Sequence, residues 1–325
     1  NGPAVGPDGM IYFGQGTATN SAIVGPDNAD FGWLSRFPAF HDIPCEDVTL
    51  AGVNYVSPNP LTEQNDQVRT GAYSPFGQPT TPGQVIPGQV PCNGSVMRVD
   101  PQGTEPELVA WGFRNPFGLT FDESGRLYVS DNSYDARGSR QVFGAGDLLW
   151  QVEEGRWYGW PDYHGSRPLA DDQHFTFPGQ HPPGQLLASH PEVPPAPVAL
   201  LGVHSSSNGL DIAAEQFGFP GDIFIAQFGD MTPNSGKVVS PVGFKVVRVD
   251  PESGVVHDFA VNVDPRGPAS LTNTAGLERP VAVRFSPDGR SLYIADFGVM
   301  TLSEEGVVPM LGTGVIWRVT REPAQ

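Results

Sequence analysis

The sequence has little positive charge and little charge of any kind. Only 17% of its 325 residues are Asp, Glu, Lys or Arg, the lysines are Lys237 and Lys245 alone, and the formal net charge is −18. Nucleic acids and anionic membranes bind basic patches, so this composition argues against both as partners. The acidic surface can serve solubility alone, or it can bind a cationic partner such as a basic electron carrier.

Helical periodicity and long apolar runs are also scarce. No stretch keeps a 3.6-residue apolar period over three turns, and no apolar run is long enough to predict a membrane-spanning helix. The 40 glycines and 34 prolines suit many short strands joined by tight turns. We therefore expect a mainly β protein without membrane insertion.

Only two cysteines are present, Cys45 and Cys92, and both lie in residues 17–95, a Pro- and Gly-rich stretch without a clear strand period. A disulfide between them would restrain the unfolded chain by about 4 kcal/mol in the chain-entropy model. Two free thiols are an alternative, and so is metal ligation, because His41 and Cys45 are spaced to share a metal. A disulfide would imply an exported protein, periplasmic or extracellular.

Four stretches repeat one pattern, a turn centred on Gly, a short alternating apolar run and a small or polar residue at its end. They read GPDGMIYFGQG (6–16), DESGRLYVSDN (122–132), GFPGDIFIAQFGD (218–230) and SPDGRSLYIADFG (286–298). A Gly turn followed by alternation marks a hairpin, and its recurrence predicts a β-propeller. If these strands are innermost, the polar residues at their ends converge at one mouth of the channel, namely Gln15, Asp131, Gln227 and Asp296.

The pattern predicts one propeller domain over residues 1–325, built from four-stranded antiparallel blades. Residues 17–95 are a long insertion, either a functional lid or a surface decoration, and residues 162–200 are a second irregular insertion. Asn1 stands directly before a strand repeat, so we expect the first blades to be missing from this chain. A separate N-terminal fragment would then complete the propeller.

The segment WGFRNPFGLTFDESGRLYVSD, followed by GDLLWQV and GRWYGWPDYHG, resembles the glucose/sorbosone dehydrogenase family. That family carries a GxRNPxGLxFDxxGxLYxxD-like run and then NYGWP, in the same order and at the same separation. GPDGMIYFGQG and GLERPVAVRFSPDGRSLYIAD fit two further strands of the family. The resemblance implies a six-bladed propeller that binds pyrroloquinoline quinone and calcium, oxidises sugars and passes electrons to an external acceptor such as a c-type cytochrome.

The resemblance also implies a cofactor pocket. Arg114 and Asn115 align with an Arg-Asn pair beside the quinone, where a guanidinium binds carboxylates bidentately and an amide donates to a quinone oxygen. Their alternative is a structural turn in which Arg114 pairs with a carboxylate. Arg279 aligns with one arginine of an RxR motif, whereas Leu277 stands at the other position. Gln15 is a further cofactor-binding candidate at the predicted mouth.

His204 stands just ahead of a strand unit and is a candidate base, because histidine titrates near neutrality. A buried histidine bonded to backbone is the alternative. Asp131 and Asn132 offer the hard oxygen ligands that calcium prefers, although Asp and Asn also favour turns. The family's calcium turn and GDEIN glutamate are replaced here by residues that include Ser133 and Leu148, and its catalytic histidine would precede Asn1.

The leading hypothesis is an exported quinone-dependent dehydrogenase that oxidises a sugar or related alcohol or aldehyde, with Arg114, Asn115 and His204 as catalytic residues. The departures at Ser133, Leu148 and Leu277 favour the alternative of a non-catalytic binding propeller that has lost the cofactor. A calcium-dependent hydrolase of the lactonase type is a third hypothesis, in which the metal polarises an ester carbonyl.

Overall fold

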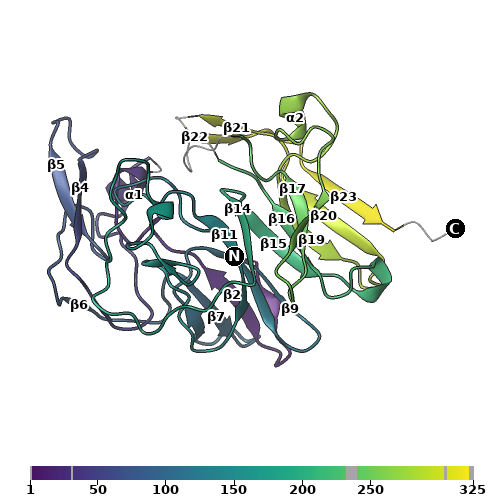
Figure 1. Cartoon of the computed structure of the whole chain (residues 1–325), viewed down its shortest axis with the longest axis horizontal. Coiled ribbons are helices and arrows are strands. Elements are labelled where there is room, and N and C mark those ends of the chain that lie inside the picture. Colours follow the sequence, from purple (N-terminus) through teal and green to yellow (C-terminus); the bar gives the residue numbers. More distant parts are fainter. Residues whose placement is uncertain (1, 31, 232–239, 304–305, 322–325) are drawn as a thin grey trace.

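The computed structural model describes residues 2–30, 32–231, 240–303 and 306–321. Four antiparallel sheets follow one another along the chain (Figure 1). The first contains β1 (Ala4–Val5), β2 (Ile11–Gln15), β7 (Ser95–Val99) and β8 (Glu107–Trp111). The second contains β9 (Pro116–Phe121), β10 (Leu127–Asp131), β11 (Gly146–Val152) and β14 (Ala199–Val203). The third contains β15 (Ser207–Ile212), β16 (Ile223–Gln227), β17 (Lys245–Val249) and β18 (Val256–Ala260), and the fourth β19 (Pro280–Phe285), β20 (Ser291–Asp296) and β23 (Val315–Thr320).

The first strands of the second, third and fourth sheets are the innermost, because they carry most of the contacts between these sheets. Strands β1 and β2 both pack on β9, β9 packs on β15, and β15 packs on β19. Each sheet then runs outward in chain order, as in a propeller blade. The all-β propeller fold predicted from the repeats is thereby confirmed.

The other elements are short. They are α1 (Trp33–Arg36), α2 (Ala269–Thr272), the 3-10 turns η1 (Pro26–Asn28), η2 (Gln173–Phe175) and η3 (Glu215–Phe217), and the strand pairs β3 (Val48–Thr49) with β6 (Val85–Ile86), β4 (Asn54–Pro58) with β5 (Gln67–Gly71), β12 (Tyr163–His164) with β13 (Arg167–Pro168) and β21 (Met300–Ser303) with β22 (Gly306–Pro309). Strands β3 to β6 lie in residues 17–95, where the sequence shows no strand period. None of the described helices is long and apolar enough to cross a membrane.

The repeated sequence motif marks the second strand of each sheet, which corrects the expectation that it marks the innermost one. Its Gly turn joins the first strand to the second, so the alternating run that follows the turn is β2, β10, β16 or β20. The turn glycines all have a positive φ, namely Gly9, Gly125, Gly221 and Gly289.

Glycine also lies at each junction between neighbouring sheets. A Cβ on Gly14 of β2 would collide with the Pro116 carbonyl, and one on Gly118 of β9 would collide with the Asn208 carbonyl. At the third junction, Gly209 of β15 packs directly on Ala282 of β19. The inner strands therefore approach each other more closely than side chains would allow, and this reduces their apolar alternation.

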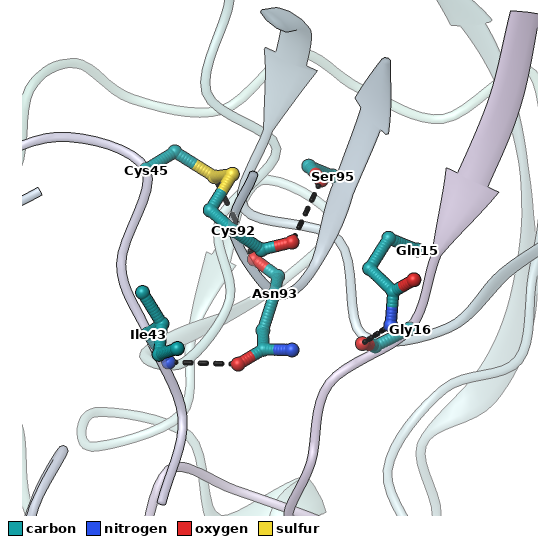
Figure 2. The surroundings of a disulfide bond; sticks show 7 residues. All are labelled: Gln15, Gly16, Ile43, Cys45, Cys92, Asn93 and Ser95. Carbon is teal, nitrogen blue, oxygen red and sulfur yellow. Dashed lines mark hydrogen bonds between the residues drawn. A yellow bond between two sulfur atoms is a disulfide. The ribbon is translucent and has the colours of Figure 1, made fainter. Parts of the chain in front are cut away.

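Cys45 and Cys92 form a disulfide across 47 residues, which confirms that prediction. Figure 2 shows the bond beside Asn93, whose Oδ1 accepts a 2.8 Å hydrogen bond from the Ile43 backbone N–H. The Ser95 hydroxyl donates to the Cys92 carbonyl at the start of β7. The insertion is thus fastened to the first sheet, and in Figure 1 it lies on the opposite side of the molecule from the fourth sheet.

Replacing both cysteines, as Cys45→Ser with Cys92→Ser, should lower the free energy of unfolding by about 4 kcal/mol, because the unfolded chain gains the entropy of an open loop. Urea unfolding under oxidising conditions measures the difference. A reductant should move the native protein toward the variant and leave the variant unchanged. Equal unfolding midpoints for the two oxidised proteins would show that the bond does not stabilise the fold.

Candidate functional site

The candidate residues lie together because each immediately precedes an innermost strand. Arg114 and Asn115 precede β9, His204 lies three residues before β15, and Arg279 precedes β19. Hydrogen bonds tie the last two loops together, since the Gly229 N–H donates to the Ser205 carbonyl and Arg279 donates to the Gly229 carbonyl. We call this end of the sheets the mouth.

Asp135 is the centre of the mouth. Its Oδ2 forms ion pairs with a terminal nitrogen of Arg114 at 2.8 Å and with Nε of Arg137 at 3.0 Å. Its Oδ1 lies 3.4 Å from Nδ1 of His204. Its backbone is fixed by Asn20, which accepts from the Asp135 N–H at 2.8 Å. Burial raises the pKa of this carboxyl, but Arg114, His204 and Arg137 outweigh burial and lower it to about 2. Asp135 is therefore an anion that joins two arginines and a histidine.

The His204 loop is strained and firmly held. His204 and Ser206 are non-glycine residues with φ of 57° and 50°, a conformation that costs on the order of 1–3 kcal/mol each and is found at functional sites. Asp147 of β11 accepts from the Ser207 N–H at 2.7 Å and from the Ser205 hydroxyl at 2.9 Å. Gln227 donates to the hydroxyls of Ser205 and Ser207. The neighbouring sheet and its own sheet thus fix the histidine.

This arrangement gives His204 the geometry of an oriented base. Its side chain is only 3% exposed, and Nδ1 faces Asp135 rather than a backbone carbonyl. Within the described ranges no residue is hydrogen-bonded to Nε2. A carboxylate on one ring nitrogen fixes the tautomer and leaves the other nitrogen to accept a proton.

Arg279 is a buried cation with mainly neutral partners. Its guanidinium lies 5.0 Å from the ring centres of both Phe228 and Phe244, and its NH1 donates to the Asp230 carbonyl at 3.1 Å. Burial lowers the pKa of Arg279, although Asp230 and Glu278 oppose that shift. The stacked guanidinium is positioned to attract an anion at the mouth.

Arg114 pairs with a carboxylate, as its structural alternative predicts, and still has unused donors. One terminal nitrogen donates to Asp135, whereas its buried Nε has no hydrogen-bond partner among the described residues. Asn115 lies beside Gly16, where a Cβ would collide with its side-chain oxygen. Gln15 is exposed and donates to the Gly16 carbonyl at 3.4 Å. Gln15 therefore lies next to the Arg114 and Asn115 loop.

Two of the polar residues that end second strands, Asp131 and Asp296, hold the loops that enter their own sheets. Asp131 accepts from the Asn115 N–H at 2.7 Å and from Trp150 Nε1 at 3.2 Å. Asp296 repeats this arrangement, with the Arg279 N–H at 2.8 Å and Trp317 Nε1 at 3.2 Å. Each carboxylate fastens the loop that enters its own sheet. Their strands lie second in their sheets, and each carboxylate holds in place the loop that leads into the first strand.

The calcium prediction at Asp131 and Asn132 falls on side chains that already have partners. Both oxygens of Asp131 accept from protein donors, and Asn132 donates to the Ser207 carbonyl at 2.7 Å. In the described part of the chain, no group of three or more His, Cys, Asp or Glu residues is arranged to hold a metal ion. Calcium at this position stays a prediction that would require these side chains to change partners.

Arg137 is the site residue that the sequence did not indicate. Arg137 stands in the irregular segment between β10 and β11 and joins Asp135 to Asp27 of the first insertion. A clue was present in DNSYDARGSR, where two arginines follow an aspartate in a chain with few cations. Its partner Asp27 is 110 residues away, so local sequence could not show the pairing.

Comparison with known proteins yields distant likenesses. No protein-family model matches the chain, and no curated protein matches it. Among solved structures, a Trichoderma reesei carbohydrate-active enzyme of family AA12 is 15% identical, with 91% of this chain and 78% of that one covered and a TM-score of 0.46. The PQQ domain of pyranose dehydrogenase from Coprinopsis cinerea is 16% identical, with 98% and 92% covered and a TM-score of 0.44. The PQQ-bound aldose sugar dehydrogenase of Streptomyces coelicolor is 15% identical, with the same coverage and a TM-score of 0.40.

The buried carboxyl of Asp131 predicts a specific pH dependence of stability. Burial raises its pKa from 3.8 to about 6, so its contribution to stability is complete below pH 3.8 and is lost as the pH rises through 6. In this window the free energy of unfolding of the native protein should fall with pH, and Asp131→Asn should reduce that slope by up to about 1.4 kcal/mol per pH unit.

Urea unfolding at several pH values between 4 and 6 measures that slope. Asp100→Asn is the control, because hydrogen bonds from Thr104 lower the pKa of this turn carboxyl below 3.8 and it titrates below the window. Asp42 has a pKa of about 6 as well and keeps its share of the slope in both variants. Identical slopes for the native protein and Asp131→Asn would contradict the assignment.

Proposed function

We propose that the protein is a quinone-dependent dehydrogenase that oxidises a sugar or related alcohol at the mouth. The observation that carries the proposal is the pair His204 and Asp135, a buried and oriented imidazole beside two arginines. Alcohol oxidation needs a base for the hydroxyl proton and an acceptor for the hydride. The choice of a sugar and of pyrroloquinoline quinone comes from the sequence resemblance.

The chain's own residues would perform the proton chemistry and the positioning. His204 Nε2 takes the hydroxyl proton as the C–H bond breaks, and Asp135 stabilises the resulting imidazolium through Nδ1. The carbon loses a hydride and becomes a carbonyl, or a lactone when the substrate is a hemiacetal. A bound quinone would supply the oxidising chemistry that accepts this hydride, and Arg114 and Arg279 would hold it.

The cations at the mouth fit an anionic, multiply carboxylated cofactor. Arg279 has a stacked guanidinium aimed at neutral carbonyls, and Arg114 has a buried Nε without a described partner. Either side chain can donate charge-assisted hydrogen bonds to a carboxylate. Asn115, with Gln15 beside it, would complete the contacts. Asp131 and Asn132 would have to change partners to bind calcium, and no step of this scheme is assigned to the metal.

The disulfide supports export to a periplasmic or extracellular compartment, because such bonds persist in oxidising surroundings. Electrons would then pass to an external acceptor, and an acidic protein with a net charge of −18 suits a basic carrier such as a c-type cytochrome. The binding-propeller alternative shares the fold and the cations but predicts no turnover.

Titration with pyrroloquinoline quinone should show binding that depends on Arg279. Arg279→Gln should weaken it roughly 10- to 100-fold, because one charge-assisted hydrogen bond is worth about 1.5–3 kcal/mol. Absorbance and calorimetry, each with and without calcium, measure the affinity. Arg279→Lys should keep part of it, and Arg290→Gln, an exposed turn arginine of the same sheet, should keep all of it. Failure of the native protein to bind the quinone would refute the dehydrogenase proposal.

His204→Gln should lower kcat for sugar oxidation by about 10²- to 10⁴-fold, because proton transfer to a positioned base is lost. Its quinone affinity should stay within a few fold of the native value, since Arg279 and Arg114 remain. Turnover of an artificial electron acceptor across an aldose panel measures the rate. His257→Gln, on exposed strand β18, is the matched control. Equal rates for His204→Gln and the native protein would remove His204 from the mechanism.

A further inference from the structure

A cleft separate from the mouth lies between the two insertions. It has a volume of about 440 Å³, within the range of about 300–1,000 Å³ found for small-molecule sites. One wall is residues 26–30 and 55–58 of the first insertion, and the other is residues 180–183 of the second. Residues 138–141, which follow β10, line the rest. None of Arg114, His204 or Arg279 is among the lining residues.

Three buried oxygens around this cleft lack hydrogen-bond partners in the described structure. They are Oδ1 of Asp27 and the hydroxyls of Ser57 and Ser139. Leaving such a group unpaired costs about 1–3 kcal/mol, and one cleft gathers three of the eight buried unpartnered atoms among the described residues. All three oxygens are almost inaccessible to solvent and belong to residues that line the cleft, so an occupant that hydrogen-bonded to them would satisfy them.

The chemistry of the lining selects the occupant. Asp27 is an acceptor and the two serines can each donate and accept, which matches adjacent hydroxyl groups. Asp27 and Asp30 are the charged lining residues, and this disfavours an anion. Tyr55 accepts from the Gly184 N–H at 2.9 Å and has its own O–H left to donate. Apolar faces come from prolines of both walls, namely Pro26, Pro58, Pro182 and Pro183.

We propose that this cleft is a binding site for a neutral sugar ring, built by the two insertions. Apolar proline and tyrosine surfaces would pack on the ring's C–H faces, while Asp27, Ser57 and Ser139 would take its hydroxyls. Asp27 is preorganised for this role because Arg137 holds its other oxygen, Oδ2, at 2.6 Å. The proposal does not require that the mouth bind a quinone or turn over a substrate.

The test uses methyl glycosides, which have no free anomeric hydroxyl to oxidise. Methyl α-glucopyranoside, methyl α-mannopyranoside and methyl β-galactopyranoside are titrated at millimolar concentrations into the native protein without quinone or calcium. Ligand-observed NMR measures the dissociation constant. At least one sugar should bind saturably, and Ser139→Ala with Ser57→Ala should weaken it about tenfold or more through lost hydrogen bonds.

Matched variants locate the binding. Thr80→Val removes a hydroxyl that is equally buried and unpartnered but does not line the cleft, and it should leave the affinity unchanged. His204→Gln should change the affinity far less than the serine substitutions, because His204 lies at the mouth and reaches Asp27 only through Asp135 and Arg137. Two results would overturn the proposal, namely no saturable binding of any of the three sugars, or binding that survives both serine substitutions. Loss in His204→Gln alone would assign the sugar to the mouth instead.

Discussion

The mouth depends on one buried anion, the carboxylate of Asp135. It joins Arg114 ahead of β9, Arg137 after β10 and His204 ahead of β15, so it links loops from two neighbouring sheets. A buried charge is tolerated only when paired, and removing its partners would leave the others uncompensated. The position of the histidine and the packing of two arginines are therefore a single electrostatic arrangement.

Three carboxylates at or shortly after the ends of second strands, Asp131, Asp296 and Asp135, have different hydrogen-bond partners and therefore different roles. Asp131 and Asp296 accept backbone N–H groups and an indole, and the burial of Asp131 raises its pKa to about 6. Asp135 meets cations, and its pKa is lowered to about 2. The first two organise the loops that enter their sheets, whereas the third provides a negative charge beside two arginines and a histidine.

The fold was readable from the sequence because Gly turns and alternation are local signals. The same locality explains the errors. The motif identifies a hairpin but not which of its strands is innermost, and that is decided by the close approach of Gly118 and Gly209 to the next sheet. Arg114 and Arg279 were singled out by the family resemblance and His204 by its place ahead of a strand unit, and the structure places all three just before inner strands. Arg137 was missed because its role depends on Asp27, which is distant in sequence.

The insertions connect to the mouth through the same ion-pair series. Asp27 binds Arg137, Arg137 binds Asp135, and Asp135 faces His204. The guanidinium of Arg137 thus pairs with one carboxylate that lines the cleft, Asp27, and with one at the mouth, Asp135. A ligand that hydrogen-bonded to the Asp27 carboxylate would weaken the ion pair between Asp27 and Arg137 and so strengthen the pair between Arg137 and Asp135. Because Asp135 fixes the His204 imidazole, such a change would reach the base without any movement of the sheets.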